Sequence, residues 1–283
     1  MDVPAGNGVL DLNEPPREEE LEDAYARYAG RHAFGLRRLP RAYQNIGTPE
    51  PFYTFHVTMG FVPLSRLREQ AKKHNASITE YLSAVLIHVI LEKQKRERPY
   101  RERPVALAVP INLRAWFPSE TLRNFITTVR PYIDPALGDY TFPEIDLAGA
   151  PFYEAAHQPA GAAGGVYRQR PLYGELCPAA HSGRAQKSRS WRSTTACSVC
   201  APIPAPTPTP AAFTVPPEMA AHIRGAEVIL GQATVPRCHC ASISYGDTME
   251  ITFAGTQAET DTERDFFRFL VREGIPVRVE SNR

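Results

Sequence analysis

The sequence predicts an α/β fold in which a mixed β-sheet is covered by packed helices. Strand patterns rich in β-branched and aromatic residues alternate along the chain with amphipathic helix patterns. Two residue pairs, Ser77 with Glu80 and Thr260 with Glu263, have the capping-box spacing that marks helix starts. Gly246-Asp247 separates two strand patterns and suits a tight hairpin turn. Because hairpin and crossover connections both occur, we expect antiparallel and parallel strand pairs in one sheet.

The first part of the chain, from Pro16 to about Glu144, carries patterns that agree with one another locally. The predicted helices are Arg17–Ala29, which Gly30 ends, Leu64–Lys73, and a helix that Ser77 opens and that runs through Leu91. The predicted strands are Phe52–Phe61, Val105–Val109 and Phe125–Tyr132. The helix that ends at Leu91 is apolar on most sides, so we expect it to be buried.

The last seventy residues show the same consistency. The predicted strands are Glu227–Leu230, Cys238–Tyr245, Met249–Phe253 and Val277–Val279. The helix that follows Thr260 has an apolar face formed by Phe266, Phe267, Phe269 and Leu270, and Gly274 ends it. This region therefore completes a sheet and adds one covering helix.

The segment between these parts, Asp146 to Ala212, has a different composition. Its 67 residues include nine prolines, fifteen alanines and only three acidic residues. No helix or strand period extends across it, and Pro202–Pro210 alternates proline with small residues, which permits only extended backbone. We therefore divide the chain into residues 1–145, an aberrant segment 146–212 that is expected to be disordered, and residues 213–283.

Charge and composition exclude several classes of function. The formal net charge is +1, so no field of one sign indicates binding to nucleic acid or to an anionic membrane. The longest apolar run, Tyr81–Leu91, is about half as long as a membrane span requires. No secretion signal is recognised, and five cysteines without a regular spacing fit a reducing compartment. We expect a cytoplasmic protein with no membrane span.

The cysteine and histidine patterns give weak candidates for a site. Cys197 and Cys200 have zinc-knuckle spacing, whereas Cys238 and Cys240 lie in a strand pattern that places both on one face and His239 on the other. We expect no metal, and a thiol or zinc module stays an alternative. His88 and Glu92 share a helix face, but a packed histidine is the simpler interpretation. No nucleophile elbow, phosphate-binding glycine loop or dinucleotide fingerprint occurs.

Several motifs together resemble a known superfamily. They are Ser77-Ile-Thr-Glu-Tyr-Leu-Ser-Ala-Val-Leu, Val109-Pro-Ile-Asn-Leu-Arg114, Leu122-Arg-Asn124-Phe, and the ending from Tyr245-Gly-Asp to Ile275-Pro-Val-Arg-Val-Glu-Ser-Asn-Arg283. Their order resembles the second half of the CoA-dependent acyltransferases, which include chloramphenicol acetyltransferase and peptide-synthetase condensation domains. The chain is most similar to bacterial alcohol acetyltransferases, over residues 1–145 and 213–283.

The resemblance implies an incomplete second half of that fold and a fragment of an O-acyltransferase. In the family, the second His of a His-His-x-x-x-Asp-Gly motif takes the proton from an alcohol or amine acceptor, which then attacks the acyl thioester. This chain contains no such motif, so we predict no catalytic residue and no substantial activity of the chain alone. The resemblance implies acyl-CoA as co-substrate, no bound cofactor, and a separately encoded N-terminal half as a possible partner. A non-catalytic, partner-binding remnant is the alternative.

The resemblance also suggests positions that line or order a substrate channel. They are Asn112, Arg114 and Asn124, which lie in a loop between two predicted strands. Hydrogen bonding at turns and strand ends explains the same residue types at least as well. We keep both interpretations of these three residues.

The aberrant segment has a specific explanation, which is a shift of reading frame. One choice of codons for Pro202–Pro210, read two bases later, gives Y-S-S-T-Y-T-N-P, close to the family pattern Tyr-Ser-x-Thr-x-x-Asn-x-Gly expected at this place. Leu147–Pro159 read one base later gives an amphipathic helix pattern. We therefore hypothesise that segment 146–212 is the product of frame errors.

Overall fold

A computed structural model describes residues 15–28, 42–45, 47–115, 117–129, 131–145, 197–199, 217–231 and 238–283. The labelled helices are α1 (Glu18–Leu21), α2 (Ala24–Tyr28), α3 (Leu64–Lys73), α4 (Ile78–Arg96), α7 (Pro217–Ala220) and α8 (Asp261–Arg272), with 3-10 turns η1 (Pro51–Tyr53), η2 (Leu113–Ala115) and η3 (Pro135–Leu137). Residues 142–145 are helical as well. The strands are β1 (His56–Pro63), β2 (Val105–Asn112), β3 (Ile126–Val129), β4 (Tyr132–Ile133), β5 (Cys197–Val199), β6 (Cys238–Tyr245), β7 (Thr248–Gly255) and β8 (Arg278–Ser281).

One mixed sheet organises these elements. The strand order is β3-β2-β5-β6-β7-β1-β8, and β4 also pairs with β2. The pairs β2–β5 and β5–β6 are parallel, and the other pairs are antiparallel. The predicted mixed sheet with packed helices is confirmed.

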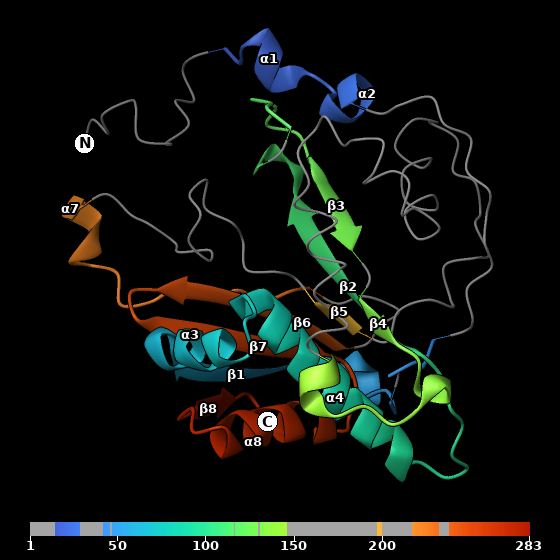
Figure 1. Cartoon of the computed structure of the whole chain (residues 1–283). Coiled ribbons are helices and arrows are strands. Elements are labelled where there is room, and N and C mark those ends of the chain that lie inside the picture. Colours follow the sequence, from blue (N-terminus) through green and yellow to red (C-terminus); the bar gives the residue numbers. More distant parts are fainter. Residues whose placement is uncertain are drawn as a thin grey trace.

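Three helices, α3, α4 and α8, cover one face of this sheet (Figure 1). The core between the layers combines apolar side chains of these helices with the inward side chains of β1, β2, β6 and β7. Helix α4 supplies more of these side chains than its neighbours, and Tyr81, Val85 and Ile90 have no exposed surface. Its apolar circumference predicted this burial, which is confirmed.

Several elements form as the local patterns predict. Helix α3 and strand β6 have the predicted bounds. At the start of α4 the Ser77 hydroxyl accepts from Glu80 N at 3.2 Å, and the Glu80 carboxylate accepts from Ser77 N at 2.7 Å, so the capping box is complete. Gly246, in the two-residue turn between β6 and β7, has φ +59°, which glycine adopts at low cost.

Other predicted elements are wrong in ways that have local causes. The predicted helix Arg17–Ala29 is interrupted, because the Asp23 carboxylate accepts from the backbone N–H of Tyr25 and Ala26 and starts a new helix. The predicted strand Phe52–Phe61 begins only at His56, after a 3-10 turn.

At the C-terminal end, three further predictions are corrected. No strand forms at Glu227–Leu230 in the described part of the chain; the Val228 N–H instead donates to the Glu250 carboxylate at 3.1 Å. Thr260 precedes α8 without a side-chain cap, and Glu263 is buried, so the predicted capping box does not form. The last strand is Arg278–Ser281, one residue later than predicted at its start.

Strand β5 lies inside the segment 146–212, for which the composition predicted no strand. Its backbone pairs with Leu107 and Ala108 of β2 and with His239 and Cys240 of β6. Its place in the sheet thus depends on its two long neighbours and not on a local pattern. The other residues of the segment lie outside the described residues.

Candidate functional site

The three residues that the sequence singled out lie at and after the end of β2: Asn112 is the last residue of β2, and Arg114 and Asn124 lie in the loop between β2 and β3. The Asn112 carboxamide oxygen accepts from the Arg114 backbone N–H at 3.1 Å and from Arg114 Nη1 at 3.4 Å. Arg114 also donates through Nε and Nη2 to the Thr121 carbonyl, at 3.3 and 2.7 Å, and through Nη2 to the Arg123 carbonyl at 2.5 Å. One guanidinium therefore ties the start of the loop to its far side.

Helices α1 and α2 pack against this loop. Leu122 N donates to the Glu20 carbonyl at 2.8 Å, and the Thr121 hydroxyl donates to the Glu22 carbonyl at 2.7 Å. A second apolar cluster, separate from the main core, joins the two parts: Ala24, Tyr25 and Tyr28 with Leu113, Phe117 and Phe125. Figure 1 shows the loop and these helices at the tip of the β2–β3 hairpin, which extends away from the three covering helices.

The structure brings together two of the three predicted residues. Asn112 and Arg114 are half-buried and bonded to each other, whereas Asn124 is exposed at the end of the loop. Their contacts are hydrogen bonds at a turn and a strand end, as the second of the two interpretations of these residues expects. A role of the three residues beside a substrate channel stays a prediction.

The sheet face turned away from α3, α4 and α8 carries buried polar groups, of which the sequence singled out only His239. Cys238 and Cys240 belong to the helix-side core, so His239 between them lies on the opposite face, as the strand pattern predicts. On the adjacent strand, Thr252 and Glu250 share this second face. All three are buried: His239 is 8% exposed, Thr252 1% and Glu250 1%.

Burial sets the protonation of these groups. Removal from water lowers the pKa of His239 below its ordinary value of 6.5, so the imidazole is neutral at pH 7. Among the described residues, its Nε2 has no hydrogen-bond partner. Burial raises the pKa of Glu250, although the Thr252 hydroxyl and the Val228 N–H both donate to its carboxylate. In the register His239 lies opposite Ala254, four residues from Glu250 and so roughly 13 Å away along the strand, too far for direct proton transfer.

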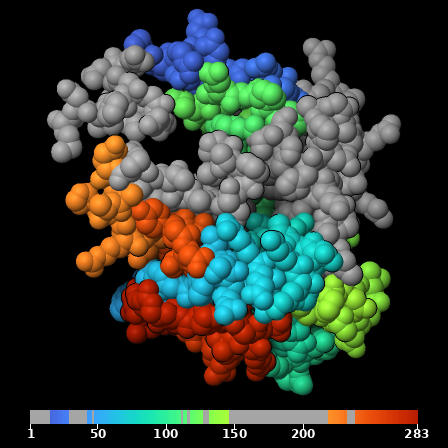
Figure 2. All heavy atoms as spheres, turned by 60° about the vertical axis from the view of Figure 1, so that its left-hand side comes forward, coloured from blue at the N-terminus to red at the C-terminus, as the bar shows by residue number. Residues whose placement is uncertain are grey.

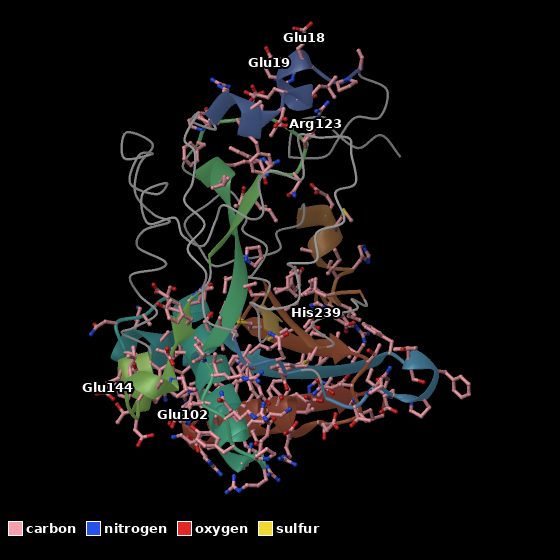
Figure 3. All side chains as sticks on the ribbon, turned by 90° about the vertical axis from the view of Figure 1, so that its right-hand side faces the viewer. Glu18, Glu19, Glu102, Arg123, Glu144 and His239 are labelled. Atoms are coloured by element: carbon pink, nitrogen blue, oxygen red, sulfur yellow. The ribbon has the colours of Figure 1, made fainter. Side chains whose placement is uncertain are left out.

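Figure 3 shows that these two regions are apart: Arg123 lies with Glu18 and Glu19 at the tip of the hairpin, and His239 lies in the main sheet. Glu250 was missed because it lies in an ordinary strand pattern. The available signal was its position at the second residue of the predicted strand Met249–Phe253, where the predicted hairpin turn places its side chain on the same face as His239.

The cysteine pattern gives no metal site in the part of the chain that the structure describes. Cys238 and Cys240 are buried in the apolar core, with His239 directed to the opposite face. Cys200 lies outside the described residues, and within those residues no three His, Cys, Asp or Glu side chains are grouped to hold a metal ion.

His88, the other candidate from sequence, is packed among aromatic rings. Its ring centroid lies 5.3 Å from that of Phe269 and 6.0 Å from that of Phe142. Burial lowers its pKa, and the Glu92 carboxylate opposes that shift. The interpretation as a packed histidine is confirmed. Among the described residues, no helix is both long enough and apolar enough to cross a membrane.

Comparison with known proteins gives matches at the level of structure only. No protein-family model matches the chain, and no curated protein sequence matches it. The nonribosomal peptide synthetase FmoA3 (S1046A), in its AMPPNP-bound form, aligns with 83% of this chain and 23% of its own, at 17% identity and a TM-score of 0.53.

Two further structures align less well. The condensation domain that mediates chain release from the enacyloxin polyketide synthase aligns with 83% of this chain and 44% of its own, at 15% identity and a TM-score of 0.48. Polyketide synthase associated protein 5 from Mycobacterium tuberculosis aligns with 76% and 51%, at 17% identity and a TM-score of 0.47. The chain thus spans about half or less of the length of these structures. Its fold is a mixed α/β fold similar to that of a part of the peptide synthetase FmoA3.

Proposed function

We propose that this chain is part of a CoA-dependent O-acyltransferase of the alcohol acetyltransferase kind, which moves an acyl group from acyl-CoA to an alcohol or similar acceptor in the cytoplasm. The observation that carries the proposal is the agreement between the fold and the order of the sequence motifs. The condensation-domain-like sheet contains the Pro-Ile-Asn-Leu-Arg114 motif at the end of β2 and the Leu-Arg-Asn124 motif before β3.

The chemistry of acyl transfer indicates that this chain does not supply the catalytic base. Attack of a hydroxyl on a thioester needs a base that takes the hydroxyl proton as the carbon–oxygen bond forms, and the thiol of CoA leaves. The chain has no His-His pair anywhere in its sequence, so the base belongs to a separate half with the His-His-x-x-x-Asp-Gly motif. This chain contributes the loop braced by Arg114 and the polar second face of the sheet with His239.

An acyl-CoA thiol-release assay tests this proposal. The purified full chain is incubated with acetyl-CoA and a panel of short alcohols, alone and together with a purified protein that carries the His-His-x-x-x-Asp-Gly half. We expect thiol release only from the mixture. Release by the chain alone at about 1 per second or more, a rate normal for enzymes, contradicts it. Complex formation without thiol release favours a non-catalytic, partner-binding remnant.

We further propose that residues 146–212 arise from frame errors within this acyltransferase. The support is the strand-like string V-Y-Y-R-L-F-G-V-R-P, which one choice of codons for Arg192–Ala201 gives when it is read two bases later. Resequencing of the gene and mass spectrometry of tryptic peptides between Tyr167 and Arg192 test it. An unbroken frame together with these peptides overturns it.

A further inference from the structure

An open groove runs between α8 and the edge strand β8. Its volume is about 710 Å³, and its apolar lining comes from Phe267 and Val271 of α8 and from Val277 and Val279 near β8. Val271 and Val279 are 55% and 49% exposed. Figure 2 shows α8 and β8, in red, at the surface on the side opposite the hairpin tip.

The groove lies at the edge of the helix layer, where the sheet extends beyond the covering helices. Helices α3, α4 and α8 cover the strands from β2 to β1, and β8 pairs with β1 beyond them. Gly60 of β1 lies under Phe267 of α8, so α8 is seated over β1 and leaves the helix side of β8 open. Helices in such layers lie about 8–10 Å apart, so a helix packed beside α8 would lie on the open side of β8.

The wall of the groove is strongly basic. Arg264, Arg268 and Arg272 recur every four residues and line it together. Arg264 has a partner in Asp265, at 3.0 Å. Within the described residues, no ion pair involves Arg268 or Arg272. Among the described residues that line the groove, Glu263 has the one side-chain carboxylate, and Glu263 is 6% exposed.

We propose that this groove is a docking site for an acidic amphipathic helix of a partner protein. Apolar side chains of that helix would cover Val271 and Val279, which now face solvent. Carboxylates spaced four residues apart on it would match the arginines, because residues four apart on both helices repeat about every 6 Å. The arginines that have no ion pair within the described residues favour an acidic partner, and the open, apolar helix side of β8 beside α8 favours a helical one.

The test uses the full chain and a fluorescent helical peptide of about 18 residues, roughly 27 Å long. The peptide has leucines at helical spacing and glutamates on both flanks, and a matched peptide has lysines in place of the glutamates. Anisotropy titrations should show binding of the glutamate peptide only, weakening as salt rises from ~0.05 to ~0.5 M. R268E/R272E should raise its Kd about tenfold or more, and Val271→Asp should raise it as well.

The matched control is Arg66→Glu, which changes an exposed arginine on α3, away from the groove. This variant should bind the peptide like the unmodified chain, and thermal unfolding should confirm that all variants fold. Equal binding of both peptides, or binding that R268E/R272E leaves unchanged, overturns the proposal. It is also overturned if the chain dimerises in sedimentation experiments and V271D alone abolishes the dimer, because the occupant is then a second copy.

Discussion

Gly60 of β1 lies directly against the ring of Phe267 of α8. A Cβ atom built at Gly60 would lie 2.1 Å from Phe267 Cε1 and 2.5 Å from Cζ. Phe267 is 5% exposed and packs edge-on against Phe253 and Phe266, at centroid distances of 5.6 Å each. The close approach of α8 to the sheet therefore depends on the missing side chain at position 60.

Gly60→Ala should lower the free energy of unfolding by about 1–3 kcal/mol, because the added methyl group displaces a packed ring. Urea denaturation followed by circular dichroism measures this. Gly225→Ala is the matched control, since no atom lies within 4 Å of a Cβ built there. Gly60→Ala combined with Phe267→Leu should lose less than the sum of the two single changes. Strict additivity would show that the two residues are not coupled.

A buried ammonium holds the C-terminal part of α4 to the start of α8. Lys93 Nζ donates to Asn45 Oδ1 at 2.7 Å, to Asp261 Oδ1 at 3.0 Å and to Thr262 Oγ1 at 3.4 Å. Lys93→Met removes these donors and leaves their partners without them, so we expect a loss of about 2–4 kcal/mol in unfolding free energy. Lys95→Met, at an exposed pair with Glu92, should cost less than about 1 kcal/mol. Equal effects of the two changes in thermal and urea unfolding would contradict this assignment.

The accuracy of the sequence predictions follows from where the deciding interaction lies. Leu64–Lys73 and Cys238–Tyr245 were predicted at their observed bounds because their apolar periods are complete within the segment. The capping box of Ser77 and Glu80 also involves only neighbours. The interruption at Asp23 is local as well, because the Asp23 carboxylate accepts from Tyr25 N and Ala26 N, and the prediction of one continuous helix overlooked this N-cap signal.

The same distinction applies to the site. The loop with Asn112 and Arg114 was predicted from a local motif, and its hydrogen bonds are local. Strand β5 depends on pairing with β2 and β6, which are distant from it in sequence, and no local pattern encodes that pairing. His239 and Glu250 lie on the two strands of one hairpin, so their shared face follows from the predicted turn at Gly246-Asp247 once the burial of Glu250 is known.

We expect the hydrogen bonds of the Arg114 guanidinium to hold the loop at the hairpin tip in its observed conformation. Arg114→Met removes donors to the carbonyls of Thr121 and Arg123, and the expected cost is about 1.5–3 kcal/mol in local or global stability. Amide hydrogen exchange of residues 113–125 should rise, while exchange in α4 stays the same. Arg123→Met, which changes an exposed side chain of the same loop, is the control. Unchanged exchange in the loop of Arg114→Met would exclude a bracing role.

Stability should fall below neutral pH in a way that His239 controls. Burial lowers the folded-state pKa of His239 below 6.5, whereas the unfolded chain keeps the ordinary value. Above pH 6.5 the imidazole is neutral in both states. As the pH falls below 6.5, the unfolded state gains a proton that the folded state does not, so unfolding becomes easier by up to about 1.4 kcal/mol per pH unit until the folded pKa is reached.

His239→Gln removes this contribution. The stability difference between the unmodified chain and His239→Gln should therefore shift in favour of the variant between pH 7.5 and 5.5, by up to about 1.4 kcal/mol. His88, whose pKa burial also lowers, is present in both proteins and cancels in the comparison. A difference that stays constant across this range would show that His239 gains its proton equally easily in the folded and unfolded states.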